Sequence, residues 1–141
     1  MNLRRVTKDE LAKTEIFVTE AYTSDRYRVD IEPGGTWIDL GSNIGLFGLY
    51  AFGKGAVRAY CYEADPRTIP LLGESIETRI KFDAQVNGMA VIAGPAGEVT
   101  VYRPTYPNHT WRSRLEPHIG KRAGGTSVVV QAVPFQSVLD A

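Results

Sequence analysis

Hydrophobic and polar positions between residues 33 and 62 predict strands and helices in alternation. After the turn signal Pro33-Gly34-Gly35, residues 36–40 form a short and mostly apolar run, as in a buried strand. Residues 44–52 are apolar on most faces and predict a short buried helix. Residues 57–62 predict a second strand of the same kind.

The next segment repeats this pattern. Asp65 and Pro66 predict a helix start, because Asp is a preferred capping residue and proline lacks the N–H that the first helical position leaves unpaired. Apolar residues from Ile69 to Ile76 recur at helical spacing, and residues 82–92 predict a third strand. This order predicts a βαβαβ unit with a parallel sheet and right-handed crossovers, which is the core of an α/β, Rossmann-like fold.

The first thirty residues predict a lead-in to this fold. Thr7 and Glu10 have the spacing of a capping box, so a short helix is expected through about Val18. We therefore divide the chain into a lead-in over residues 1–30 and one domain over residues 31–141.

The pattern changes after residue 97. Residues 98–103 and 127–133 are rich in β-forming side chains and predict an antiparallel ribbon. Between them, residues 104–126 predict a long loop. His109 and His118 in that loop have no cysteine or acidic cluster around them, so exposed side chains are expected rather than a metal site. The loop also has a local excess of positive charge, which could attract an anionic acceptor or could simply be solvated. It comes from Arg112, Arg114, Lys121 and Arg122.

Composition excludes several classes of protein. The sixteen basic and sixteen acidic residues balance, so nothing global attracts nucleic acid or anionic lipid. The single cysteine, Cys61, excludes an intrachain disulfide and a cysteine-cluster metal site, and it is expected in the core. The sequence has neither a signal-type segment nor a run of about 18 apolar residues, so a reduced, cytoplasmic protein without a membrane partner is expected.

Two features converge at the carboxyl ends of the first two predicted strands, where open parallel sheets bind ligands. Gly41 and Gly45 allow the backbone to pass close to a ligand, beside the N-terminus of the next helix. Glu63 follows the second strand, 22 residues after Gly41, which is about the offset expected for an acid that binds a ribose diol.

The identity of the ligand depends on Asp39. The turn lacks the second glycine of a dinucleotide motif and the lysine of a phosphate-binding loop. A carboxylate two residues before Gly41 repels phosphate but suits a ligand with an ammonium and a sulfonium. The sequence therefore points to S-adenosylmethionine, although Asp39 could equally cap the backbone of residues 42–45.

The combination of a D-x-G-x-N-x-G turn, Asp39 to Gly45, with an E-x-D-P strand end, Glu63 to Pro66, resembles the FkbM-type family of S-adenosylmethionine-dependent O-methyltransferases. The resemblance covers roughly residues 31–141. It implies a class I methyltransferase fold that binds S-adenosylmethionine and methylates a hydroxyl of a small molecule or glycan.

The resemblance also assigns site residues. It implies that Asp39, Gly41 and Gly45 shape the methionine side of the pocket, and that Glu63 holds the ribose hydroxyls. It places further residues along the pocket and near the adenine: Ser42, Asn43, Leu46, Ala64, Asn87, Gly88 and Met89. It names no catalytic base, and His109 is the one loop histidine to test.

The chain ends after Leu139-Asp140, where the family continues into strands that supply much of the acceptor pocket. We therefore expect the fold to be shortened at its C-terminus, with a second copy or a partner chain covering the sheet edge. Two other hypotheses stay open. One is a non-catalytic module that binds the cofactor or a partner protein, and the other is an enzyme that cleaves the cofactor.

Overall fold

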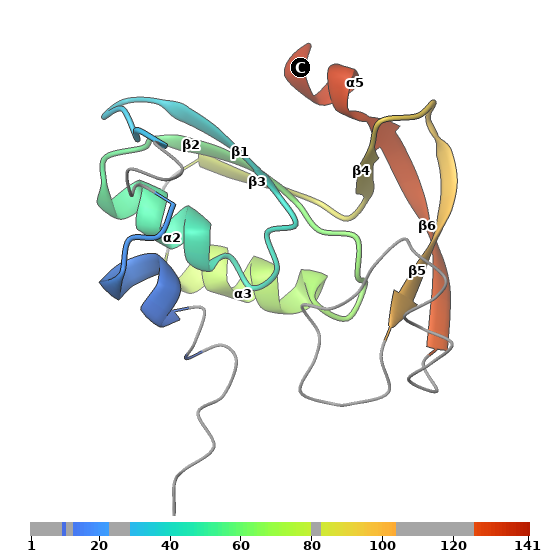
Figure 1. Ribbon diagram of the computed structural model, residues 1–141, viewed down its shortest axis with the longest axis horizontal. Helices are drawn as coiled ribbons and strands as arrows, with labels where there is room; N and C mark the ends of the chain where they lie inside the picture. Colours follow the sequence, from blue (N-terminus) through green and yellow to red (C-terminus); the bar gives the residue numbers. More distant parts are fainter. Residues whose placement is uncertain (1–9, 11–12, 23–28, 80–82, 104–125) are drawn as a thin grey trace, which may run out of the picture.

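The computed structural model describes residues 10, 13–22, 29–79, 83–103 and 126–141. These residues form two three-stranded sheets with helices against the first of them (Figure 1). The predicted long loop, both histidines and the basic cluster lie outside the described residues, apart from Thr126, which begins a strand. The division of the chain at residue 30 stays a prediction.

The first sheet is parallel, as the sequence predicts. Its order is β1 (Thr36–Leu40), β2 (Arg58–Tyr62) and β3 (Asp83–Asn87). The chain crosses from β1 to β2 through α2 (Leu46–Gly53) and from β2 to β3 through α3 (Ile69–Arg79). The chain is thus an α/β protein with a βαβαβ unit, and the first two strands and the two helices lie within a few residues of their expected bounds.

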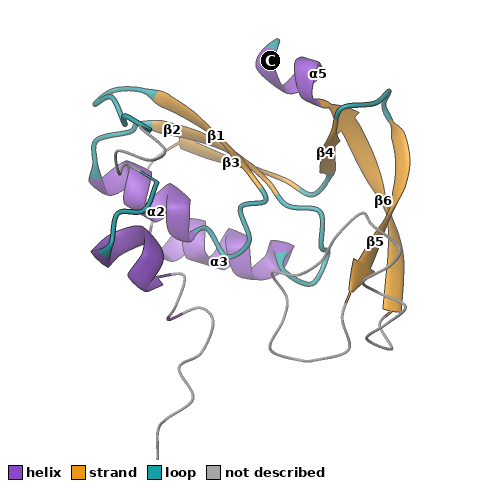
Figure 2. Ribbon diagram, viewed as in Figure 1, coloured by secondary structure: helices purple, strands orange, loops and turns teal. Residues whose placement is uncertain are grey.

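Both crossover helices lie on the same side of this sheet (Figure 2). That arrangement follows from the strand order, because successive right-handed crossovers between neighbouring strands return on one face. The core beneath the helices contains Ala59 and Cys61 from β2 together with Leu72 and Ile76 from α3. Cys61 is buried there, as expected.

The turn before β1 is also confirmed. The N–H of Gly35 donates to the carbonyl of Glu32 at 3.0 Å, and Gly34 has a φ of 81°. Proline followed by a residue with positive φ is the pattern of a type II turn, which requires glycine at its third position.

The second sheet has the order β4 (Ala90–Ile92), β6 (Thr126–Pro134) and β5 (Gly97–Arg103). Strands β5 and β6 are antiparallel, which confirms the predicted ribbon, whereas β4 pairs with β6 in parallel. A buried cluster of Ala90, Val101, Val130 and Ala132 holds this sheet together.

The single strand predicted over residues 82–92 is wrong. The segment is divided into β3 and β4, which belong to different sheets. The N–H of Met89 donates to the carbonyl of Asn87 at 3.0 Å, closing a three-residue turn that ends β3. A Cβ on Gly88 would lie 2.8 Å from Cδ1 of Ile69, so glycine allows α3 to approach this turn. Apolar residues resume at Met89 and suggest one strand, although the dipeptide Asn87-Gly88 is a turn signal at the break.

Two short helices complete the described chain. The π-helix η1 (Thr14–Val18) ends where the N-terminal helix is expected to end, and its Ile16 packs with Leu46 and Tyr50 of α2. Its predicted capping residue, Thr7, lies outside the described residues. Helix α5 (Phe135–Leu139), which the pattern does not predict, follows β6. None of the helices in the described ranges has the length and apolar character to cross a membrane.

Leu72 and Leu71 provide a test of the packing between α3 and the sheet. Leu72 is 0% exposed and Leu71 is 48% exposed, although they are adjacent in one helix. We expect Leu72→Ala to lower the free energy of unfolding by about 2–5 kcal/mol, because it opens a cavity in the core. Leu71→Ala is the matched control, for which urea denaturation should show a change below about 1 kcal/mol. Equal losses would contradict the packing.

Candidate functional site

Parallel pairing brings the carboxyl ends of the three strands of the first sheet together. Leu40 lies beside Tyr62, and Tyr62 lies beside Asn87. The predicted Gly41–Gly45 turn, the segment after Glu63 and the turn at Asn87 therefore begin at one edge of the sheet. This edge is the candidate functional site.

The turn after β1 has a positive φ at three alternate residues. Gly41, Asn43 and Gly45 have φ values of 81°, 49° and 81°. The N–H groups of Gly41 and Ser42 both donate to the carbonyl of Tyr62, at 2.9 and 3.0 Å, which fixes the turn to β2. Positive φ is costly for residues with a Cβ, so glycine is required at the two outer positions.

The two glycines have different second roles. A Cβ on Gly41 would meet no atom within 4 Å, so the backbone there faces open space that a ligand can approach. A Cβ on Gly45 would lie 3.0 Å from Cδ1 of Leu72, so this glycine also allows α3 to pack against the turn. Gly41 is therefore the one whose surroundings fit a ligand.

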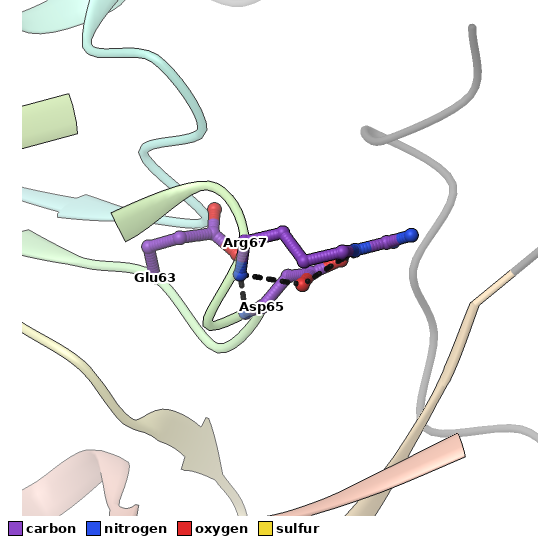
Figure 3. Close-up of polar contacts among 3 residues, drawn as sticks. All are labelled: Glu63, Asp65 and Arg67. Carbon is purple, nitrogen blue, oxygen red and sulfur yellow. Dashed lines mark hydrogen bonds and ion pairs between the residues drawn. The ribbon is translucent and has the colours of Figure 1, made fainter. Parts of the chain in front are cut away.

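Glu63 holds the turns after β1 and β2 together. Its Oε2 accepts a hydrogen bond from the backbone N–H of Asn43 at 2.9 Å, and its Oε1 accepts one from the N–H of Asp65 at 2.7 Å (Figure 3). A carboxylate has about four lone-pair positions, so two remain for a ligand. Glu63 is also only partly buried.

Asp39 does not cap the turn, since its carboxylate accepts no backbone hydrogen bond in the described part of the chain. Its main-chain carbonyl accepts a hydrogen bond from Oγ of Ser42 at 2.8 Å. Its carboxylate oxygen Oδ2 is buried and has no hydrogen-bond partner among the described residues. Burial raises the pKa of Asp39 to about 6; Ser42 opposes the shift and the negative charge of Glu63 adds to it. A cation beside Oδ2 would relieve this cost.

Two further buried polar atoms near this edge lack partners among the described residues. They are Oδ1 of Asn43, an acceptor, and Nδ2 of Asn87, a donor. The Oδ1 atom of Asn87 already accepts a hydrogen bond from Nε2 of Gln85 at 3.2 Å, which fixes the orientation of its amide. Buried polar groups in proteins are nearly always paired, so a ligand or an ordered water would complete the hydrogen bonding of these atoms.

The other predicted site residues take part in packing or in a turn. Leu46 packs with Ile16 and Tyr50, and Ala64 packs against the core of the second sheet. Gly88 and Met89 form the turn between β3 and β4. Contact of these residues with a cofactor stays a prediction.

Asp65 is a structural residue, as expected. Its Oδ1 accepts a hydrogen bond from the N–H of Arg67 at 3.0 Å, and its carbonyl accepts one from Thr68 at 2.9 Å. These bonds lead into α3, which begins at Ile69, a few residues later than predicted. The Arg67 side chain, which the sequence analysis does not single out, forms an ion pair with Asp65. The sequence signal for this ion pair is an acid and an arginine two residues apart, on either side of Pro66.

The described residues near this edge support neither a thiolate nucleophile nor a metal site. Burial first, and the charge of Asp39 second, raise the pKa of the Cys61 thiol to about 11, so it is not a thiolate nucleophile at neutral pH. No group of three potential metal ligands occurs in the part of the chain that the structure describes.

Comparisons with known proteins leave the family open. No family model matches the chain, and no curated protein matches it. Among solved structures, the chain is similar to a protein of Pyrococcus horikoshii provisionally described as an RNA methyltransferase. The two share 24% identity over 61% of this chain and 46% of that one, with a TM-score of 0.38. The chain thus spans less than half of that protein, and a likeness at this level carries no argument. Membership of the FkbM-type family stays a hypothesis.

Asp39→Asn tests the buried carboxylate. Because folding raises its pKa from 3.8 to about 6, its contribution to stability is fully present below pH 3.8 and is lost as the pH rises through 6. Two pKa units correspond to about 3 kcal/mol. We therefore expect the variant to gain up to about 3 kcal/mol over the wild type between pH 4 and pH 7.

Urea denaturation across this pH range measures the difference, with Asp30→Asn at an exposed aspartate as the control. A difference between wild type and Asp39→Asn that stays constant with pH would show that Asp39 carries no desolvated charge.

Proposed function

We propose that the protein binds S-adenosylmethionine at the carboxyl edge of its first sheet, in a Rossmann-like fold, and is a methyltransferase. The observation that carries this proposal is Oδ2 of Asp39, which is buried and has no hydrogen-bond partner among the described residues, two residues before the open backbone of Gly41. The motif resemblance further favours an FkbM-like O-methyltransferase whose acceptor is a hydroxyl of a small molecule or glycan.

Charge decides between S-adenosylmethionine and other nucleosides. A buried carboxylate at this position repels the pyrophosphate of a dinucleotide or nucleotide. The methionine part of S-adenosylmethionine carries an ammonium and a sulfonium, either of which would stabilise the ionised form of Asp39. The pKa of about 6 reflects the cost of the ionised carboxylate in its buried position, which such a cation would reduce.

The remaining polar groups fit the rest of the same molecule. Two lone-pair positions of Glu63 are free for the two hydroxyls of a ribose. The Nδ2 donor of Asn87 suits a ring nitrogen of adenine, and Oδ1 of Asn43 suits a donor group of the ligand. The set contains acceptors for a cation and a diol together with a donor for a base.

The bound cofactor supplies an activated methyl group, so the protein contributes mainly by alignment. Asp39 fixes the charged end, and Glu63 fixes the ribose. The turn from Gly41 to Gly45 keeps both at a set distance, because it is hydrogen-bonded to Tyr62 and to Glu63. Deprotonation of an acceptor hydroxyl needs a base, for which His109 remains the candidate.

One observation favours the non-catalytic alternative. Both oxygens of Glu63 are already used by backbone N–H groups, so the turn is complete without a ligand. Under this hypothesis the glycine turn is architectural, or it binds the cofactor without turnover.

Isothermal titration of S-adenosylmethionine and S-adenosylhomocysteine tests the proposal. We expect dissociation constants in about the micromolar range, weakened at least about tenfold, or 1.4 kcal/mol, by Glu63→Ala. The control is Glu74→Ala on the exposed face of α3, which should bind as the wild type does.

Absence of binding by the wild type would contradict the cofactor site and favour an architectural turn. Binding without methyl transfer to any hydroxyl acceptor would favour the non-catalytic module. Release of a cleaved product without an acceptor would favour an enzyme that cleaves the cofactor.

A further inference from the structure

The segment after β2 contains an ion pair between groups of very different exposure. The Asp65 side chain is 1% exposed and that of Arg67 is 44% exposed. Nη2 of Arg67 donates to Oδ2 of Asp65 at 2.6 Å, and Nε donates to Oδ1 at 3.1 Å (Figure 3). The guanidinium therefore holds a buried carboxylate through two of its nitrogens, from the solvent side.

This ion pair is connected to Glu63 through the backbone. The N–H of Asp65 donates to Oε1 of Glu63 at 2.7 Å, so the position of the Asp65 main chain determines where that oxygen lies. The Asp65 carbonyl also accepts the N–H of Thr68, at 2.9 Å, which anchors the segment to the start of α3. A shift of Asp65 would move Glu63, whose other oxygen holds Asn43.

A buried carboxylate that loses its positive partner tends to move toward solvent or to take up a proton. Movement of Asp65 toward solvent would change the path of the backbone between Glu63 and Arg67. Protonation would weaken the hydrogen bond that Oδ1 of Asp65 accepts from the backbone N–H of Arg67, which holds the same path. One lone pair on each oxygen of Glu63 accepts a backbone N–H group. The direction of the two lone pairs that remain for a ligand therefore depends on that path.

We propose that the Asp65–Arg67 ion pair is a positioning device for Glu63, which sets the affinity of the site for the two ribose hydroxyls without touching the ligand. This inference rests on the proposed function and goes beyond it, because it assigns a role in ligand recognition to two residues that are not proposed to contact the ligand. Asp65 and Arg67 are positioning residues in this sense and not catalytic ones.

A purely structural ion pair would have a different effect. It would support the turn or the start of α3, and its loss would weaken every ligand of the site by the same factor. A positioning role is specific to Glu63, so the loss must depend on whether the ligand carries the hydroxyls that Glu63 binds.

The test is a titration with two ligands: S-adenosylhomocysteine and an analogue that lacks both ribose hydroxyls. In Arg67→Met the affinity for S-adenosylhomocysteine should fall about tenfold, whereas the affinity for the analogue should fall less than about threefold, within the range of one hydrogen bond to a charged group. Arg67→Lys keeps the charge but not the paired geometry and should recover part of the loss. Asp65→Asn should resemble Arg67→Met.

Arg58→Met is the matched control. Arg58 forms an ion pair with Asp83 at 2.6 Å, at the opposite end of β2, and both side chains are more than half exposed. It should bind both ligands as the wild type does, because surface ion pairs contribute little. Thermal denaturation checks that each variant is folded. If Arg67→Met is not folded, the conservative variant Arg67→Lys takes its place in the titration.

The outcomes separate the two proposals. If the wild type binds no S-adenosylhomocysteine, the proposed function is wrong and this inference is wrong with it. If the wild type binds and the Arg67 variants lose equal affinity for both ligands, or lose none, the cofactor site stands and the positioning role is overturned. A loss confined to the ligand with ribose hydroxyls supports it.

Discussion

The carboxylate of Glu63 is the interaction on which the arrangement of the site depends. It accepts the N–H of Asn43 from the turn after β1 and the N–H of Asp65 from the turn after β2. Asn43 has a positive φ, which is costly for a residue with a Cβ, whereas Gly41 and Gly45 adopt positive φ without that cost. The hydrogen bond from Asn43 to Glu63 helps to offset the cost. One side chain thus fixes two loops that parallel pairing brings to the same edge.

The burial of Asp39 follows from this arrangement. Glu63 accepts the backbone N–H of Asn43, and the N–H groups of Gly41 and Ser42 donate to the carbonyl of Tyr62, so these three N–H groups are already paired. Oδ2 of Asp39 is left without a partner among the described residues, with a pKa of about 6. A site that holds a desolvated carboxylate in this way is suited to a cation. The ionised carboxylate lowers the stability of the free protein, and a bound cation would remove that cost.

Much of the fold could be predicted from the sequence, because strands of five residues bounded by glycine and proline give a clear signal. The bounds of β1 and the antiparallel pairing of β5 with β6 agree with the pattern. The break between β3 and β4 has a signal in the sequence, the turn dipeptide Asn87-Gly88, but apolar residues resume at Met89 and suggest one strand. The close approach of Ile69 of α3 to this turn is a tertiary contact that the sequence pattern does not contain. The sequence could place Asp39, Gly41 and Glu63 at one edge of the sheet. It could not show that Glu63 rather than Asp39 accepts the backbone N–H of the glycine turn, because that depends on hydrogen-bond geometry.

The most direct test of the account is the number of protons released when S-adenosylmethionine binds at pH 6. Titration calorimetry in two buffers of different ionisation enthalpy measures this number. With a pKa of about 6, Asp39 is about half protonated in the free protein. A cation beside its carboxylate would drive that proton off, so the account predicts release of about half a proton per ligand in the wild type and none in Asp39→Asn. Binding without proton release, or with the same release in both proteins, would contradict the claim that Asp39 is the charged anchor of the site.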